Sequence, residues 1–396
     1  MKTRSLTLMG LGLVGLAGVA SAQTFVDAGD LPTARQMHSC AYDVTTKTVY
    51  ALGGNIPASN GLDVILGVND SIGADYATID LSGPITVSAS GQGPLMNDFK
   101  VNCGSADDGV ATYNSDGAFV YNGKVYMTPG NTNAAAPWAV NKILMTDIGV
   151  DGSLAGTWVD ATATNPPPAP SGAGNVVFDA GWEVYNGRVY RALGREALEA
   201  CGGGSSIAVS GSVVSAPING DGTIGAWRTE TALSVDRRWG SLYIIDGLAV
   251  FVGGYEVGGT TRYSDVYVAP VSSVDGTIGT WSLSANSYPS EIYMSSGCVD
   301  HDDEIYVLTG RKEAGVGVTA AYKTKVNAAG TDIEPWTQFA TLPVTQGHRY
   351  GAASGGDGVY VITGGRDDAA SSTLLESVWV LNTNVPAAAG QWNLYN

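Results

Sequence analysis

Arginine is the residue of this chain best suited to binding chemistry, because it is scarce and its positions recur. Arg195, Arg311 and Arg366 each follow a glycine directly, in the segments GRE, GRK and GRD. A guanidinium group binds carboxylate, sulfate or phosphate through paired hydrogen bonds. We therefore expect a binding face for an anionic ligand, with these candidate residues: Arg35, His38, Arg195, Arg237, Arg238, Trp239, Arg311, His348, Arg349, Tyr350 and Arg366.

Acidic residues in the same segments offer a structural explanation for these arginines. Glu196, Glu313 and Asp367 stand beside or close to three of them. Surface ion pairs contribute little net free energy, and an ion-pair pattern alone does not define a site. Each arginine therefore has a structural interpretation beside the functional one.

Local motifs of enzymatic catalysis are absent from the sequence. It contains no phosphate-binding P-loop, no G-x-S-x-G, no H-E-x-x-H and no dinucleotide motif after a strand. The segments N-G-D-G and V-D-G resemble fragments of calcium loops, but they are too short for such a loop and indicate turns. We expect neither a cofactor nor a metal site, and the sequence singles out no catalytic residue.

The elements that carry these residues form an internal repeat with a period of about 50 residues. An aromatic strand that ends in glycine recurs at 47–54, 123–130, 187–194, 247–254, 303–310 and 357–365. A turn followed by tryptophan recurs at 150–158, 219–227, 274–281, 330–336 and 387–392. Together with a lead-in strand and an alternating strand between these two marks, each unit has four strand signals. The D-G turns indicate antiparallel hairpins, because glycine accepts a positive φ.

This repeat resembles the kelch repeat of β-propellers. The glycine pair, the tyrosine and the tryptophan are clearest at Gly253-Gly254, Tyr267 and Trp281, and a segment such as LPTAR leads into the first unit. The resemblance implies an all-β fold, a six-bladed kelch-like propeller with four-stranded antiparallel blades. It implies one domain over residues 23–396. Seven blades is the alternative, if residues 55–118 contain a further blade.

The ends of the chain are expected to close the ring. TFVDAG (24–29) and QWNLYN (391–396) are both typical of a fourth strand, and ITVSAS (85–90) is expected to end the first unit, which lacks the tryptophan. A closed ring leaves no exposed sheet edge between its ends. We expect the two termini to meet in the last blade, and the sequence does not decide which segment takes the outer edge.

The strand order assigns the loops to two faces. The turns between the first and second strands, and between the third and fourth, are short and share one face. The longer segments lie on the opposite face, which we call the long-loop face, and loops of this kind commonly carry function. The candidate arginines fall on the long-loop face.

Three functions fit this arrangement. The leading hypothesis is a non-catalytic binding or scaffold module for a protein or an anionic glycan. The alternative comes from the family resemblance, since kelch-type propellers include sialic-acid mutarotases. Such an isomerase needs an acid/base pair and an arginine for the substrate carboxylate, roles open to Glu196, His348, Arg237 and Arg238. An axial pocket with two or more arginines and a buried carboxylate would favour the enzyme, whereas a filled mouth would favour the binding module.

A copper radical oxidase is the third reading, because such enzymes also use kelch-type propellers. They need two tyrosines and a cysteine crosslinked to one of them. Tyr350 and Cys40 are the nearest candidates, and no matching motif surrounds them. So incomplete a ligand set is a weak indication of copper.

The N-terminus indicates export. Lys2 and Arg4 precede an apolar segment that ends in Ala20-Ser21-Ala22, which predicts a signal peptide over residues 1–22 cleaved after Ala22. We expect a secreted or periplasmic protein without a membrane span. The formal net charge of −17 argues against nucleic-acid binding. If a disulfide forms, we expect Cys103–Cys201, because these residues fall in neighbouring units; the oligomeric state is open.

Overall fold

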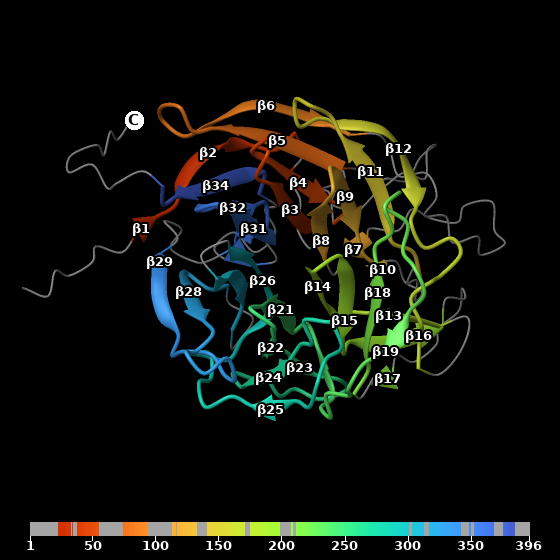
Figure 1. The fold of residues 1–396 in the computed structure, drawn as a ribbon. Helices are drawn as coiled ribbons and strands as arrows, with labels where there is room; N and C mark the ends of the chain where they lie inside the picture. The colour runs from red at the N-terminus through yellow and green to blue at the C-terminus, as the bar shows by residue number, and fades with distance from the viewer. Residues whose placement is uncertain are drawn as a thin grey trace, which may run out of the picture.

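The protein is a ring of six β-sheets arranged as the blades of a propeller around a central axis (Figure 1). This architecture comes from a computed structural model, which describes residues 23–32, 34, 38–54, 74–93, 113–115, 117–132, 141–170, 175–198, 207–208, 211–300, 303–312, 317–341, 348–349, 352–367 and 375–384. The prediction of a six-bladed, all-β propeller is confirmed. Within these residues, no helix is long and apolar enough to cross a membrane.

Each blade is built on four antiparallel strands, and in blades I to V these four follow one another in the chain from the axis outward. Blade I comprises β3 (Ser39–Asp43), β4 (Thr48–Leu52), β5 (Ala74–Asp80) and β6 (Thr86–Gln92). Blade II comprises β8 (Ala118–Tyr121), β9 (Lys124–Met127), β11 (Leu144–Ile148) and β12 (Leu154–Asp160). Blade III comprises β14 (Gly181–Tyr185), β15 (Arg188–Ala192), β18 (Val213–Pro217) and β19 (Arg228–Thr229).

The other three blades repeat this plan. Blade IV comprises β21 (Ser241–Ile245), β22 (Leu248–Val252), β24 (Val266–Pro270) and β25 (Ser282–Leu283). Blade V comprises β26 (Tyr293–Asp300), β27 (Glu304–Arg311), β28 (Ala320–Lys325) and β29 (Thr337–Thr341). Blade VI comprises β31 (Ala352–Gly356), β32 (Val359–Thr363) and β34 (Ser377–Asn382), and its outer strand is β2 (Val26–Asp30).

The N-terminal segment closes the ring. β2 pairs antiparallel with β34 and so becomes the fourth strand of blade VI. β1 (Gln23–Thr24) pairs parallel with β29 of blade V, which gives that blade a fifth strand. Of the two segments that the sequence offered for the outer strand of the last blade, TFVDAG therefore takes this position. QWNLYN lies outside the described residues.

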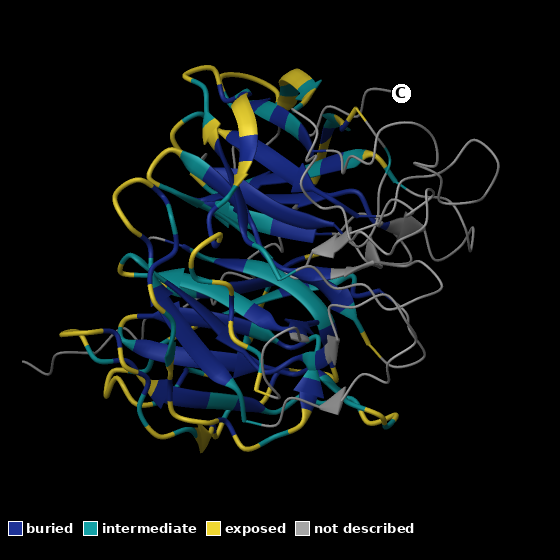
Figure 2. Ribbon diagram, turned by 90° about the vertical axis from the view of Figure 1, so that its right-hand side faces the viewer, coloured by how far each residue is buried: buried dark blue, intermediate teal, exposed yellow. Residues whose placement is uncertain are grey.

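Tight turns explain why the two inner strands of each blade are adjacent. In the N-G and D-G pairs of blades II, III, IV and VI, both residues have positive φ, for example 47° and 71° at Asn186 and Gly187. This combination matches the type I′ turn, whose twist fits an antiparallel hairpin. The short exposed turns gather along one side of the ring, while the blades between them are largely buried (Figure 2).

A repeated hydrogen bond joins neighbouring blades. The hydroxyls of Tyr50, Tyr126 and Tyr190 donate to the carbonyls of Gly152, Gly222 and Gly276 in the D-G turns of the following blades, at 2.9, 3.1 and 2.8 Å. Val250 occupies the equivalent position in blade IV, and the next blade has no D-G turn there. The aromatic strand and the D-G turn of the repeat therefore serve one interblade contact.

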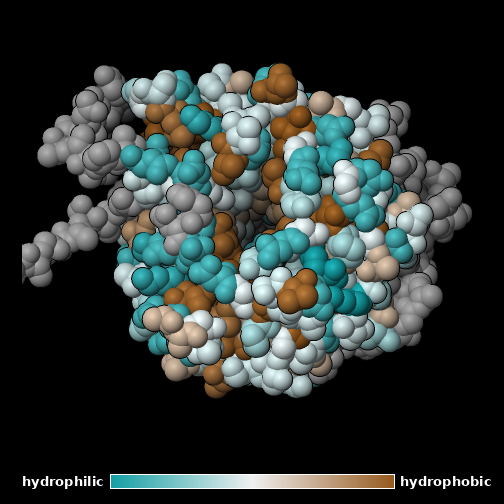
Figure 3. All heavy atoms as spheres, viewed as in Figure 1, coloured by the Kyte–Doolittle hydropathy of each residue, from teal (hydrophilic) through white to brown (hydrophobic). Residues whose placement is uncertain are grey.

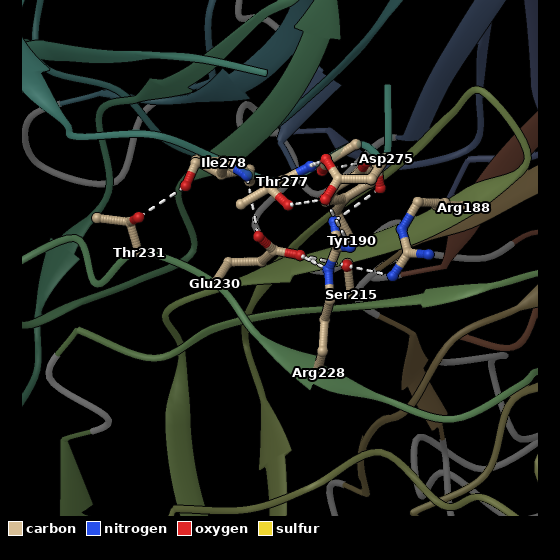
Figure 4. Close-up of polar contacts among 10 residues, drawn as sticks. Arg188, Tyr190, Ser215, Arg228, Glu230, Thr231, Asp275, Thr277 and Ile278 are labelled. Atoms are coloured by element: carbon tan, nitrogen blue, oxygen red, sulfur yellow. Dashed lines mark hydrogen bonds and ion pairs between the residues drawn. The ribbon is translucent and has the colours of Figure 1, made fainter. Parts of the chain in front are cut away.

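Blades III and IV are also joined by a buried polar network around Glu230 (Figure 4). Its carboxylate accepts hydrogen bonds from Ser215 Oγ at 2.5 Å, Arg228 Nε at 2.6 Å and the Ile278 backbone N–H at 2.9 Å. Arg188 in turn donates to Ser215 Oγ at 2.8 Å. A buried carboxylate with this set of donors is well satisfied, so the network links the two blades by hydrogen bonds.

Short sheets on the long-loop face were not predicted. Most of them pair the segment that leads into a blade with the segment that follows its glycine-terminated strand. These pairs are β7 (Tyr113–Ser115) with β10 (Gly130–Thr132), β13 (Asn175–Phe178) with β16 (Arg195–Leu198), β20 (Arg237–Arg238) with β23 (Tyr255–Glu256), and β30 (His348–Arg349) with β33 (Arg366–Asp367). In blade III, β16 also pairs with β17 (Ile207–Ala208), which lies later in the same loop. Several candidate arginines therefore lie on strands, which fixes their side-chain directions.

Two of the cysteines are buried as free thiols. Burial raises the pKa of the Cys40 thiol to about 12, and the pKa of Cys298 is raised in the same way. Thiols in this state are poor nucleophiles. The expected Cys103–Cys201 pair lies outside the described residues.

Candidate functional site

A cavity of about 790 Å³ lies on the axis of the ring. It is lined mainly by the innermost strands of the six blades, β3, β8, β14, β21, β26 and β31. The space-filling view shows a hollow at the centre of the ring on the face seen in Figure 1 (Figure 3). A cavity of this size matches the volumes of small-molecule sites.

The two ends of the cavity differ in charge. On the long-loop face its lining includes His38, Asp179, Arg195, Trp239 and Arg311. The opposite end has Asp246 and Asp303 in the short turns. Partial burial and the neighbouring Asp303 raise the pKa of the Asp246 carboxyl. An anion is therefore attracted to the long-loop end and repelled from the other.

Arginines and aromatic rings form a compact patch at the long-loop end. We call it the arginine–aromatic patch; it comprises Arg195, Arg238, Trp239, Tyr255, Arg262, Tyr293 and Arg311. The centres of its three rings form a triangle with sides of 5.7, 6.0 and 5.3 Å. Each guanidinium carbon lies 3.8–5.9 Å from the centre of at least one of these rings. These distances are those of cation–π contacts.

Asp179 is a buried carboxylate that contacts two arginines of the patch. Its Oδ2 lies 2.5 Å from Arg195 Nε and 3.8 Å from Arg238 Nη1. Burial raises the pKa of Asp179, and the two arginines act in the opposite direction. Burial and the nearby Arg195 lower the pKa of Arg238. An anion bound beside Arg238 would offset the burial of this guanidinium and its repulsion by Arg195.

The backbone at the mouth holds three side chains in an uncommon conformation. Asp179, Trp239 and Met294 have φ of 59°, 58° and 50°. The first two stand just before the inner strands of blades III and IV, and Met294 is the second residue of β26 in blade V. The Trp239 N–H donates to the Asp179 carbonyl at 2.7 Å, and the Met294 N–H donates to the Trp239 carbonyl at 2.8 Å. Left-handed conformations of non-glycine residues are often found at ligand sites. These linked backbones therefore hold the patch rigidly.

Arg237 and Arg238 are neighbours in the chain but point to different surroundings. The Arg237 side chain is 4% exposed, forms a bidentate ion pair with Asp265 at 2.6 and 2.7 Å, and stacks on Tyr263. Alternation along β20 then directs Arg238 toward Trp239, 3.8 Å from its ring centre. Arg237 is therefore buried and paired with Asp265, whereas Arg238 belongs to the patch.

His38 lies in the cavity wall, where it joins two blades. Its Nε2 is 2.8 Å from Thr363 Oγ1 of blade VI, and the ring is buried. Among the other candidates, Arg35 and Tyr350 lie outside the described residues. The backbones of His348, Arg349 and Arg366 lie in β30 and β33, and their side chains are not among the described parts.

Glu183 is a residue of the cavity wall that the sequence did not single out. It lies on β14 two residues beyond Gly181, about 7 Å deeper along the strand. Burial raises the pKa of its carboxyl to about 8, opposed by a hydrogen bond from the Val184 N–H to Oε1 at 2.7 Å. The side chain is half-buried, so a ligand in the cavity can reach it. No motif in the sequence marks Glu183, because its burial in the cavity wall results from the packing of strands that are distant in the chain.

In the described part of the chain, no group of three or more His, Cys, Asp or Glu residues is arranged to hold a metal ion. Of the residues considered for a copper centre, Cys40 is a buried thiol and Tyr350 lies outside the described residues.

Comparison with known proteins gives a likeness of fold. No protein-family model and no curated protein sequence matches the chain. Among solved structures, it is similar to that of YjhT, with a TM-score of 0.57 and 11% sequence identity over 89% of this chain and 96% of that one. At this identity the likeness concerns the architecture, which extends over almost the whole of both chains.

Proposed function

We propose that the protein is an isomerase of an acidic sugar, of the sialate-mutarotase type, acting in the axial cavity. The observation that carries this proposal is an open cavity whose lining combines Arg195 and Arg311 with the buried carboxylate of Asp179 and the protonatable carboxyl of Glu183. A mouth filled by side chains would have favoured a binding module instead. The kelch-like repeat and the likeness to YjhT are consistent with this reading of the fold.

The patch binds the substrate through its charge. One guanidinium fork holds the sugar carboxylate by paired hydrogen bonds. The rings of Trp239, Tyr255 and Tyr293 cover the apolar face of the sugar, as aromatic side chains do with their large apolar surfaces. The sugar ring then extends into the cavity toward Glu183.

Glu183 supplies the proton transfer. Because its pKa is about 8, the carboxyl is mostly protonated at neutral pH. Its O–H donates a proton to the ring oxygen while its other oxygen takes the proton of the anomeric hydroxyl. The bond between the anomeric carbon and the ring oxygen breaks, which yields the open-chain carbonyl form. Closure on the opposite face reverses these transfers, so that the protein ends unchanged.

A non-catalytic module for an anionic glycan or a protein is the second candidate. The same patch supports it, because anion binding by the arginines requires no proton transfer. Under either candidate, we propose an exported protein, in the periplasm or the medium, on the basis of the predicted signal peptide. The two candidates differ in whether Glu183 matters for turnover.

Binding and exchange measured on one sample separate these candidates. Isothermal titration with N-acetylneuraminate gives affinity, and NMR exchange spectroscopy gives the rate of anomer interconversion. We expect both binding and acceleration, with Arg238→Gln weakening binding about tenfold, as for one lost charge-assisted contact. Binding without acceleration would favour the module. Absence of binding would overturn the assignment of the patch to sugar acids.

A further inference from the structure

The arginine–aromatic patch contains more cationic groups than one carboxylate requires. A single guanidinium fork satisfies a carboxylate with two hydrogen bonds. The patch gathers four guanidinium groups around a triangle of rings whose sides do not exceed 6.0 Å. Like charges at this spacing repel one another unless anions lie between them. The number of guanidinium groups therefore indicates a ligand with more than one anionic group.

The four arginines divide into two pairs. Arg195 and Arg238 share Asp179 and the ring of Trp239. Arg262 and Arg311 share the ring of Tyr293, at 5.8 and 5.1 Å from its centre. Asp179 stands on the side of the first pair.

Each pair includes a buried donor without an acceptor. Arg238 Nε and Arg262 Nε are both buried and have no hydrogen-bond partner. A buried donor of this kind is uncommon in a native protein and points to an acceptor from outside the chain. The two guanidinium carbons lie 5.2 and 5.8 Å from the centre of the Tyr255 ring, so they are at most about 11 Å apart. A ligand of one or two sugar rings spans such a distance.

Two described carboxylates near the patch are already engaged. The exposed carboxylate of Glu256, next to Tyr255, accepts hydrogen bonds from the N–H and Oγ1 of Thr261. Asp265 is held by Arg237, away from the rings. Neither carboxylate is directed at the orphaned Nε atoms. An added anion is therefore the natural acceptor for each pair.

We propose that the patch binds a sugar derivative with two anionic groups, one at the Arg195–Arg238 pair and one at the Arg262–Arg311 pair, with the sugar lying on the ring triangle between them. This inference rests on the proposed function and narrows its substrate class. Two kinds of molecule have this chemistry: a disaccharide of sugar acids, and a sugar acid that carries a phosphate.

Titration calorimetry with three probes tests the proposal on the full mature chain. The probes are N-acetylneuraminate with one carboxylate, its α2,8-linked dimer with two, and its 9-phosphate. We expect at least one doubly anionic probe to bind tenfold or more tightly than the monoanion, and the dimer and the phosphate distinguish the two sources. Arg262→Gln should weaken the binding of that doubly anionic probe by a clearly larger factor than it weakens the binding of the monoanion.

Two further variants keep the result interpretable. Lys325→Gln removes one positive charge from an exposed site on β28 and should change neither affinity. Arg262→Lys keeps the charge without the fork and should retain part of the preference, with an unchanged melting temperature as a check of folding. Equal affinity for monoanion and dianions, or an equal effect of Arg262→Gln on both, would overturn the inference and leave the proposed function standing. Binding of none of the probes would overturn both.

Discussion

Replacing Glu183 by glutamine tests the environment of the axial cavity through stability. Burial raises the pKa of this carboxyl from 4.5 to about 8. Between these two values the folded protein holds a proton that the unfolded chain has released. The free energy of unfolding of the wild type therefore falls as pH rises through this interval. Glutamine does not titrate, so Glu183→Gln lacks this contribution.

The expected magnitude follows from the width of the interval. About 3.5 pH units correspond to about 5 kcal/mol at 1.36 kcal/mol per unit. The carboxyl is half-buried and faces the cavity, so solvent screening reduces the effect to roughly 2–3 kcal/mol. We expect the variant to gain stability relative to the wild type by this amount between pH 5 and pH 9.

Urea denaturation at five pH values measures this difference directly. Titrations shared by the two proteins cancel in the difference, and Glu291→Gln, at an exposed carboxyl, provides the matched control. The pH dependence of the difference for Glu183→Gln is compared with that of this control. A difference for Glu183→Gln that does not change with pH would refute the assignment of a raised pKa, and with it the protonated carboxyl on which the proposed mechanism depends.

Three further substitutions test the contacts that shape the ring, each by urea denaturation. Tyr190→Phe removes the hydrogen bond to the next blade and should cost about 1 kcal/mol; an unchanged midpoint would contradict the interblade role. Glu230→Ala leaves buried donors of blades III and IV unpaired and should cost about 3–5 kcal/mol, more than Glu230→Gln. Arg237→Ala should cost about 3 kcal/mol by leaving Asp265 without its partner; a loss of ligand affinity at full stability would instead make Arg237 a binding residue.

The repeat made the fold accessible from the sequence. The glycine-terminated aromatic strands became the second strands of the six blades, and ITVSAS overlaps β6, the outer strand of blade I. These predictions succeed because strand, turn and interblade contact depend on local patterns that recur. Ring closure by β2 was left open, since the sequence offered two similar segments and pairing with β34 is a long-range contact.

The site was less accessible from the sequence, for a physical reason. Arg195, Trp239 and Arg311 were predicted and do line the mouth of the cavity. The different surroundings of Arg237 and Arg238 depend on β20, a short strand that pairs across a loop. The raised pKa of Glu183 depends on its burial in the cavity wall, which the packing of the inner strands creates. Properties that arise from packing between distant segments have no signal in the local sequence, so they could not be predicted from it.

The rate of anomer interconversion is the measurement that tests the central proposal most directly. The reaction starts from a single anomer of N-acetylneuraminate, and the approach to equilibrium is followed by NMR at pH 7. We expect a rate proportional to the concentration of wild-type protein, reduced by about 10²-fold or more in Glu183→Gln, as for loss of a general acid/base, and unchanged in Lys325→Gln. A rate equal to the spontaneous one in the presence of the wild type would contradict the account.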